Sequence, residues 1–242
     1  MTDPTDPLVS PELVPPDPGG EARVLPMFPL GTVLVPGAPL PLHVFEPRYQ
    51  ALVQDCLAAD GEFGVVLITR GSEVGGGDLR AEVGTVAGIV EAASMAGGRW
   101  ALGCAGLRRI RVLGWLDDDP YPRAEVVDWP DEAPGPEVDL PAALERVRVQ
   151  LRHVLAQLAE LGVRAAPATL ELPDDPVLAS YAAVAVGPFG PFDAYSLLTE
   201  PGPASRLART ERLLAEEGEV LAQRLALGDE DDEDDEAPPT AG

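Results

Sequence analysis

Short apolar runs separated by turn residues fill the first half of the chain. Between residues 23 and 130 these runs are bounded by Gly and Pro at close intervals, as at Pro36-Gly37 and Gly97-Gly98. This spacing is typical of β-strands joined by tight turns. Gly97-Gly98 separates two of the runs and predicts a two-residue hairpin turn. The expected strands cover residues 24–28, 33–35, 42–45, 64–70, 82–94, 100–104, 109–115 and 124–129.

One helix is expected within this β-rich part. Proline has no backbone N–H and suits a first helical position, which makes Pro47 a helix start. The following residues place Tyr49, Leu52 and Cys56 at helical spacing, and Gly61 can end the helix. Many short strands with close turns favour a barrel or a sandwich.

Arginine and aliphatic residues alternate from Arg109 to Val112. Successive side chains of a strand point to opposite faces, so Arg109 and Arg111 share one face while Ile110 and Val112 share the other. We expect the aliphatic face in the core and the arginines paired with acidic neighbours, where each such pair contributes little. The alternative is a basic strip that binds acidic peptide or RNA, formed by Arg99, Arg108, Arg109 and Arg111.

Apolar residues recur at helical spacing after residue 140. A stripe over residues 144–161 predicts one helix, and Asp175-Pro176 predicts the start of a second. Residues 192–200 favour a short third helix, and residues 203–227 a long fourth one. Each helix has one apolar side that must be buried, so we expect a small bundle.

Composition divides the chain into a β-rich part and a helical part between two polar ends. Segments this polar cannot bury enough apolar surface to fold by themselves. The expected fold class is therefore α+β. The expected parts are a disordered leader at 1–20, a β-rich domain with one helix at 21–130, a linker at 131–140, a helical bundle at 141–227 and a disordered acidic tail at 228–242.

Acidic residues outnumber basic ones, and every basic residue is an arginine. The 242 residues carry 41 Asp and Glu against 17 Arg and no Lys, for a net charge of −24. Residues 21–227 alone hold 29 acidic residues and all 17 arginines. Proteins bind phosphate backbones by releasing counterions to Lys and Arg, so this balance disfavours nucleic acid as a partner.

The sequence lacks the residues that several reaction classes require. A phosphate-binding P-loop and a Ser-Lys protease both need lysine. Cys56, Cys104, His43 and His153 do not fall at metal-ligand spacing, so we expect the cysteines to be buried free thiols. No G-x-S-x-G motif occurs. We therefore expect no catalytic residue, no metal and no cofactor, and a protein that is not an enzyme.

The sequence predicts a cytoplasmic protein. Its first residues have neither the cationic region nor the apolar region of a signal peptide. No run approaches the length of about 18 apolar residues that a membrane-spanning helix needs. We therefore expect no membrane partner.

Several ordered motifs resemble the Lon protease N-terminal, substrate-binding domain family. The opening of that domain typically contains L-P-x-F-P-L, V-L-x-P-G, L-P-L and F-E-P-R-Y. V-G-T-x-A, G-x-x-R-F-R-V and P-Y-x-x-A-E-V follow in the same order, and Ile110 stands here where the family has Phe. In this chain the motifs lie at residues 25–30, 33–37, 40–42, 45–49, 83–87, 106–112 and 120–126, within a resemblance that spans about residues 23–227.

The resemblance implies a PUA-like β-barrel followed by a small helical bundle, in agreement with the residue pattern. In full-length Lon proteases this domain precedes an ATPase module and a Ser-Lys protease domain. A chain without lysine cannot build either of them. The sequence therefore resembles a stand-alone member that lacks the ATPase and protease domains.

The function implied is a non-catalytic binding module for unfolded or damaged polypeptide. An exposed apolar groove, lined by the first loops of the barrel and by the helical lobe, would accept extended apolar segments. The expected partners are unfolded or apolar polypeptide segments, and a role as adaptor to a separate protease is left open. RNA binding by a PUA-like barrel and small-ligand binding at the mouth of the barrel are the alternatives.

Candidate contact residues lie in the first motifs of the β-rich part. Glu46 and Arg48 flank Pro47, which favours either a polar clamp on a peptide or a helix cap with a local ion pair. His43 alternates with apolar neighbours, where a lone histidine is more often structural than a base. Tyr49 lies on the apolar stripe and is expected in the core. The candidate substrate-binding residues are Phe28, Leu30, His43, Glu46, Arg48 and Tyr49.

Overall fold

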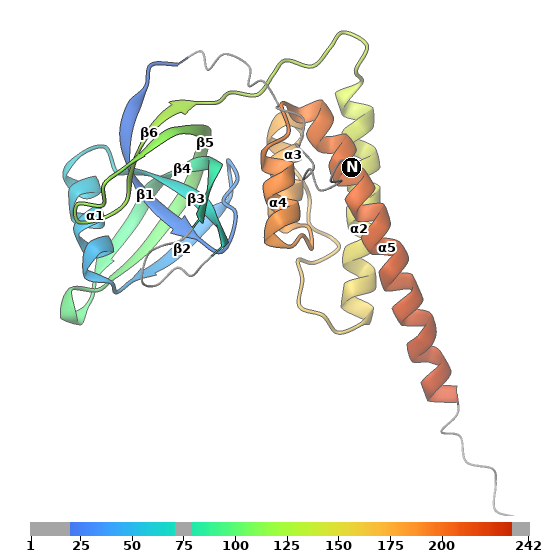
Figure 1. Cartoon of the computed structure of the whole chain (residues 1–242). Helices are drawn as coiled ribbons and strands as arrows, with labels where there is room; N and C mark the ends of the chain where they lie inside the picture. The colour runs from blue at the N-terminus through green and yellow to red at the C-terminus, as the bar shows by residue number, and fades with distance from the viewer. Residues whose placement is uncertain (1–19, 71–78, 234–242) are drawn as a thin grey trace, which may run out of the picture.

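The computed structural model describes residues 20–70 and 79–233, without the side chains of residues 228–233. Its elements form two lobes (Figure 1). We name residues 20–130 the β lobe and residues 139–233 the helical lobe. The α+β class expected from the sequence is confirmed. The leader expected at residues 1–20, apart from Gly20, and the last residues of the expected acidic tail lie outside the described part of the chain.

The strands of the β lobe form one sheet with the order β2-β5-β4-β3-β1-β6. Because β5 also pairs with β6, all described strands except β2 close into a ring, and β2 is attached to β5. β1 and β3 are parallel, whereas the other pairs are antiparallel. The strands are β1 (Arg23–Leu30), β2 (Pro39–Val44), β3 (Glu62–Arg70), β4 (Leu79–Ser94), β5 (Trp100–Leu116) and β6 (Arg123–Asp128).

Neighbouring residues of β1 enter two separate apolar clusters, as the alternation of side chains along a strand requires. Met27 is fully buried and packs with Val66 and Ile110. Phe28 packs in the other cluster, where its ring stacks on Tyr49 of helix α1 (Pro47–Ala58) with centroids 4.1 Å apart. The helix expected at Pro47 is therefore present, and its apolar side covers the sheet.

The segment 33–35 is not a strand, although the sequence predicted one. It lacks a strand partner among the described residues, yet Leu34 and Val35 are buried. The backbone here lies close to β5, since a Cβ on Gly106 would be 2.3 Å from the carbonyl oxygen of Val35. Side-chain packing rather than strand pairing therefore explains the apolar residues of this loop.

Two expected strands, at residues 100–104 and 109–115, are one continuous strand, β5. The register between β4 and β5 shifts twice, so the pair bends without ending. The hairpin between β4 and β5 is confirmed, but its connection spans residues 95–99 rather than two residues. Gly97 and Gly98 both have positive φ angles, of 79° and 74°, which glycine adopts without strain.

The helical lobe consists of α2 (Leu140–Glu160), α3 (Pro176–Val186), α4 (Pro191–Leu198) and α5 (Pro203–Glu233). Asp139 and Asp175 accept hydrogen bonds from the first N–H groups of α2 and α3. Leu151 of α2 packs with Leu214 of α5 in the apolar core of the bundle. α5 extends past α2 (Figure 1) and continues beyond the expected end at residue 227, because an established helix adds residues at little cost.

The two lobes meet in a buried apolar cluster. Val35 and Val83 of the β lobe pack with Val184 of α3 and Leu197 of α4. The loop that contains Val35 is therefore covered by the helical lobe. These side chains bury the apolar part of that loop against the helices, whereas the sequence placed the first loops in an exposed apolar groove. No described helix is long and apolar enough to cross a membrane.

Candidate functional site

Three of the candidate contact residues lie in the core. Phe28, Leu30 and Tyr49 are 8%, 6% and 4% exposed and belong to one apolar cluster beneath α1. Tyr49 was expected there because of its place on the apolar stripe of the helix. In this conformation the three side chains pack the β lobe and have almost no surface with which to contact a partner.

Glu46 and Arg48 form the local ion pair that the sequence predicted together with a helix cap. Arg48 Nε donates to Glu46 Oε2 at 3.0 Å, and the guanidinium lies 4.5 Å from the centroid of the Tyr49 ring. Glu46 occupies the N-cap position of α1, but its side chain makes no capping hydrogen bond. The expected cap is therefore absent, since the carboxylate turns to Arg48 instead.

His43 is exposed near the end of β2, on the edge of the sheet. A ligand pocket at His43 would require a buried carboxylate beside a buried imidazole, and the exposed position does not provide this environment. Within the described residues, no three His, Cys, Asp or Glu side chains are grouped so that they could hold a metal ion.

Phe45, Gln50 and the loop 95–99 together form one end of the β lobe, which we name the hairpin surface. Gln50 Nε2 donates to the carbonyl oxygen of Phe45 at 2.8 Å. A Cβ on Gly98 would lie 2.9 Å from Gln50 Oε1, so this glutamine bridges the two segments. Phe45 is 60% and Met95 43% exposed. The hairpin surface therefore presents an aromatic and a thioether side chain to solvent.

Beside the hairpin surface, β2 presents an edge with few hydrogen-bond donors. Gly106 N donates to Ala38 O, which fixes the alternation of paired and outward backbone groups along β2. Pro39, Pro41 and His43 therefore face outward, and of these only His43 has an N–H. Prolines at such positions protect an edge against addition of another strand. A polypeptide at this end would be held by side chains rather than by strand pairing.

Arg109 crosses from β5 to the helical lobe, where only 1% of its side chain remains exposed. Its Nη2 lies 2.6 Å from Asp131 Oδ1. Its Nη1 donates to the carbonyl oxygens of Leu198 and Glu200, at 2.8 and 2.6 Å, at the C-terminal end of α4. A cation is favourable there because the helix dipole is negative at that end. Burial lowers the pKa of Arg109, and the Asp131 carboxylate opposes this shift.

Arg206 of α5 forms an ion pair with the same carboxylate oxygen of Asp131. It is fully buried and donates to Ser180 Oγ at 2.7 Å and to Tyr181 Oη at 3.0 Å. Tyr181 Oη in turn donates to Asp131 Oδ1 at 2.9 Å. We name Arg109, Asp131, Tyr181 and Arg206 the Asp131 cluster. It connects β5, the segment after β6, α3 and α5, and so fixes how the lobes are oriented.

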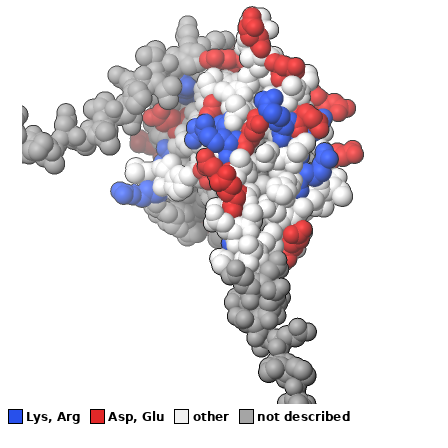
Figure 2. Space-filling view, turned by 90° about the vertical axis from the view of Figure 1, so that its right-hand side faces the viewer, with Lys and Arg blue, Asp and Glu red and all other residues white. Residues whose placement is uncertain are grey.

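Two arginines of the basic strip considered from the sequence, Arg108 and Arg109, are paired with acidic side chains. Arg108 binds both carboxylate oxygens of Glu62, at 2.8 and 2.6 Å, and also contacts Asp128 at 3.2 Å. Arg23 lies 2.6 Å from Asp128. Burial alone would raise the pKa of Asp128, but Arg23 and Arg108 bring it below its usual value. Basic and acidic side chains are also interspersed on the helical-lobe face in Figure 2.

Cys56 and Cys104 are buried free thiols, as the sequence predicted. Burial raises the pKa of Cys56 to about 12, with contributions from Asp60 and Asp55, and the pKa of Cys104 to about 11. At neutral pH both groups are therefore protonated and are poor nucleophiles.

The closed sheet and the helical bundle together form a two-lobed α+β module. Comparison with known families places it. The model of the ATP-dependent protease La (LON) substrate-binding domain matches residues 24–216, so the match includes both lobes. The chain belongs to this family.

The similar proteins are Lon proteases and domains of them. Lon protease 2 of Myxococcus xanthus is 34% identical over 142 residues, and Lon protease of Anaeromyxobacter dehalogenans is 33% identical over 141 residues. Each alignment covers 57% of this chain and 17% of the relative's length. The chain therefore matches only the substrate-binding portion of these much longer proteins.

Two solved structures have the same fold. The Lon N-terminal domain protein from Xanthomonas campestris is 31% identical with a TM-score of 0.55, and the alignment covers 80% of this chain and 98% of that one. The N-terminal domain of Mycobacterium avium complex Lon protease gives a TM-score of 0.57 at 18% identity, covering 81% and 98%. The family resemblance and the fold expected from the sequence are confirmed.

Proposed function

We propose that the chain binds unfolded or damaged polypeptide without catalysing a reaction. The observation that carries this proposal is the family match over residues 24–216, which extends through both lobes of a substrate-binding domain. An adaptor role, in which the bound polypeptide is passed to a separate protease, is the finer form of the proposal. A cytoplasmic location accords with both forms.

The hairpin surface supplies contacts that suit such a partner. Phe45 and Met95 are exposed apolar side chains, and aromatic and methionine side chains can pack against varied apolar partners. The adjoining edge of β2 has prolines at two outward positions, which favours side-chain contact over strand addition. A folded protein keeps its apolar side chains buried, whereas an unfolded one exposes them to this surface.

The proposal is tested by fluorescence anisotropy with one labelled model protein in two forms. A reduced and alkylated form stays unfolded, and the native form serves as its matched control. We expect the unfolded form to bind and the native form to remain free. Equal binding of both forms, or binding of neither, contradicts the proposal. A labelled single-stranded RNA tests the RNA alternative, and tight binding that weakens steeply with salt would favour it.

A further inference from the structure

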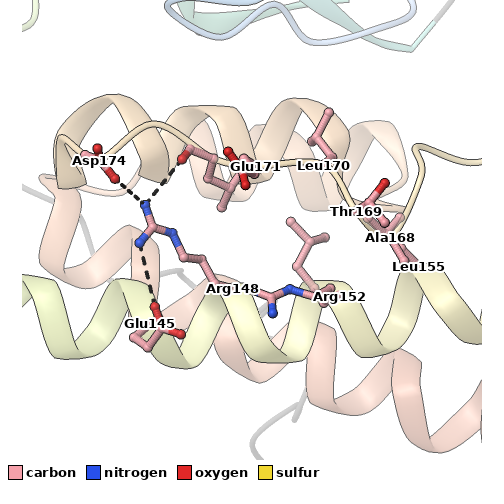
Figure 3. A pocket seen from close by; sticks show the side chains of 11 residues that line it. Glu145, Arg148, Arg152, Leu155, Ala168, Thr169, Leu170, Glu171 and Asp174 are labelled. Carbon is pink, nitrogen blue, oxygen red and sulfur yellow. Dashed lines mark hydrogen bonds and ion pairs between the residues drawn. The ribbon is translucent and has the colours of Figure 1, made fainter.

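A cavity of about 500 Å3 lies in the helical lobe, between α2 and the segment 168–174 that leads to α3 (Figure 3). Its volume falls within the range of ligand pockets in proteins. Apolar residues form part of its lining, among them Leu151 and Leu155 of α2 and Leu170 of the facing segment. Charged side chains form much of the remainder, so the lining is amphipathic rather than purely apolar.

Arg148 holds the two walls of this cavity together. It donates to the carbonyl oxygen of Pro173 at 2.8 Å. It also pairs with Asp174 at 3.4 Å, as a dashed line in Figure 3 indicates. Glu145 lies 3.6 Å from it, one helical turn earlier on α2. Leu172 of the same segment is 8% exposed and packs into the bundle core. The wall is therefore a fixed part of the fold, and the charge of Arg148 is already compensated.

Arg152 is the second cation in the lining, one helical turn beyond Arg148 on α2. It makes no hydrogen bond or ion pair with a described residue, and Figure 3 draws no dashed line from it. A guanidinium presents parallel N–H donors that match the two oxygens of a carboxylate. Arg152 thus offers a site for one carboxylate, next to the leucine side chains of the cavity.

We propose that this cavity binds the C-terminal end of an unfolded polypeptide whose last residues are apolar. The terminal carboxylate contacts Arg152, and the last apolar side chain lies against Leu170, which is 39% exposed. This inference rests on the proposed function and names the part of the polypeptide that is recognised. The amphipathic lining matches a peptide, which carries polar backbone groups between its side chains.

Charge complementarity selects the terminal carboxylate over other anions. Glu145, Glu171 and Asp174 also line the cavity, so a ligand with several negative charges is repelled. A peptide that is neutral or basic except for its terminus brings one negative charge to Arg152, the arginine of the lining without a partner among the described residues. A long-chain fatty acid carries the same carboxylate, but its tail has no polar groups to meet the charged part of the lining.

The test uses the full chain and a short labelled peptide that ends in apolar residues, as a free acid and as a C-terminal amide. Anisotropy titrations are run with the unaltered protein, Arg152→Gln and Arg212→Gln. Arg212 is an exposed arginine of α5 outside the cavity and serves as the matched control. We expect the amide to bind about fivefold to tenfold more weakly than the acid, as for loss of one charge-assisted contact. Arg152→Gln should abolish this difference, and Arg212→Gln should retain it.

Equal binding of acid and amide by the unaltered protein overturns the inference, as does a difference that persists in Arg152→Gln. The inference is also overturned if octanoate displaces the peptide and binds as tightly as the peptide does, which would indicate that the cavity binds a small acid. The proposed function is judged separately with the unfolded model protein. If the unfolded model protein binds the unaltered chain, but the unaltered chain does not distinguish the acid from the amide, the terminus inference fails and the proposed function stands.

Discussion

Arg109 of the β lobe lies 2.6 Å from Asp131, and the side chain of this arginine is 1% exposed. The same carboxylate receives Arg206 from the helical lobe. Two buried cations therefore depend on one anion. The other partners of Arg109 are backbone carbonyl oxygens, and those of Arg206 are Ser180 Oγ and Tyr181 Oη. The cluster therefore joins the two lobes through one shared carboxylate.

Removing the charge of Asp131 should destabilise the protein strongly. Asp131→Asn leaves two buried guanidinium groups without their carboxylate, and breaking a buried pair in this way costs about 3–5 kcal/mol. The measurement is the free energy of unfolding from urea titration. Glu211→Gln is the control, because Glu211 pairs with Arg146 on the surface, where loss of a pair costs about 0–1 kcal/mol. If both variants lower the free energy of unfolding by the same small amount, the cluster does not hold the lobes together.

The hairpin surface should be needed for binding and not for folding. Phe45→Asp removes an aromatic side chain that is 60% exposed, so the melting temperature should change little. Affinity for an unfolded model protein should fall about tenfold if Phe45 is a principal contact. Phe192→Asp is a matched control, because Phe192 is 66% exposed on the other lobe. If Phe192→Asp lowers the affinity as much as Phe45→Asp, the site is assigned to the wrong surface.

A backbone N–H donor added to the free edge of β2 should allow this edge to pair with a strand of another molecule. Pro41→Val adds an N–H at an outward position of the edge, next to the one at His43. A strand from a second molecule could then pair with β2, so we expect dimers or larger species. Light scattering after size-exclusion chromatography measures this change. Leu57→Val is the control, since it alters an exposed side chain on α1 and adds no donor. An unchanged monomer fraction in Pro41→Val contradicts the role given to the prolines.

Stability should fall as the pH rises above 9, because of the buried thiols. The pKa of Cys56 rises from 9.0 to about 12 on folding, and that of Cys104 to about 11. Between these values the unfolded thiols lose protons and the folded ones keep them, so unfolding is favoured. Each thiol contributes a slope of up to about 1.4 kcal/mol per pH unit. Urea titrations at several pH values should give a shallower decline for Cys56→Ala. An identical decline in this variant would exclude Cys56 as a cause.

Local sequence signals located most elements of the fold. Asp175 and Pro176 predicted the start of α3, because a cap and a first-turn proline act within a few residues of each other. The stripe that contains Tyr49 likewise predicted a buried helix face. By contrast, the loop at residues 33–35 has the apolar pattern of a strand, and its burial against the other lobe depends on distant residues.

The candidate site was less predictable than the fold. Asp131 was assigned to a linker because its neighbours are polar and Pro-rich, and nothing nearby in the sequence indicates its partners Arg109 and Arg206. Phe28 and Leu30 lie in family motifs, yet the motifs reflect packing, since both side chains are buried. Exposure of Phe45 and the cavity at Arg152 arise from tertiary contacts, which the order of residues along the chain does not reveal.

Hydrogen–deuterium exchange of this chain with and without a saturating unfolded model protein tests the central claim most directly. The account predicts slower exchange in peptides that cover Phe45 to Gln50 and the loop 95–99, and no change when the native form of the same protein is added. Exchange that stays the same at saturation in these segments, or slows equally with the native form, would contradict the claim that the module selects unfolded polypeptide through the hairpin surface.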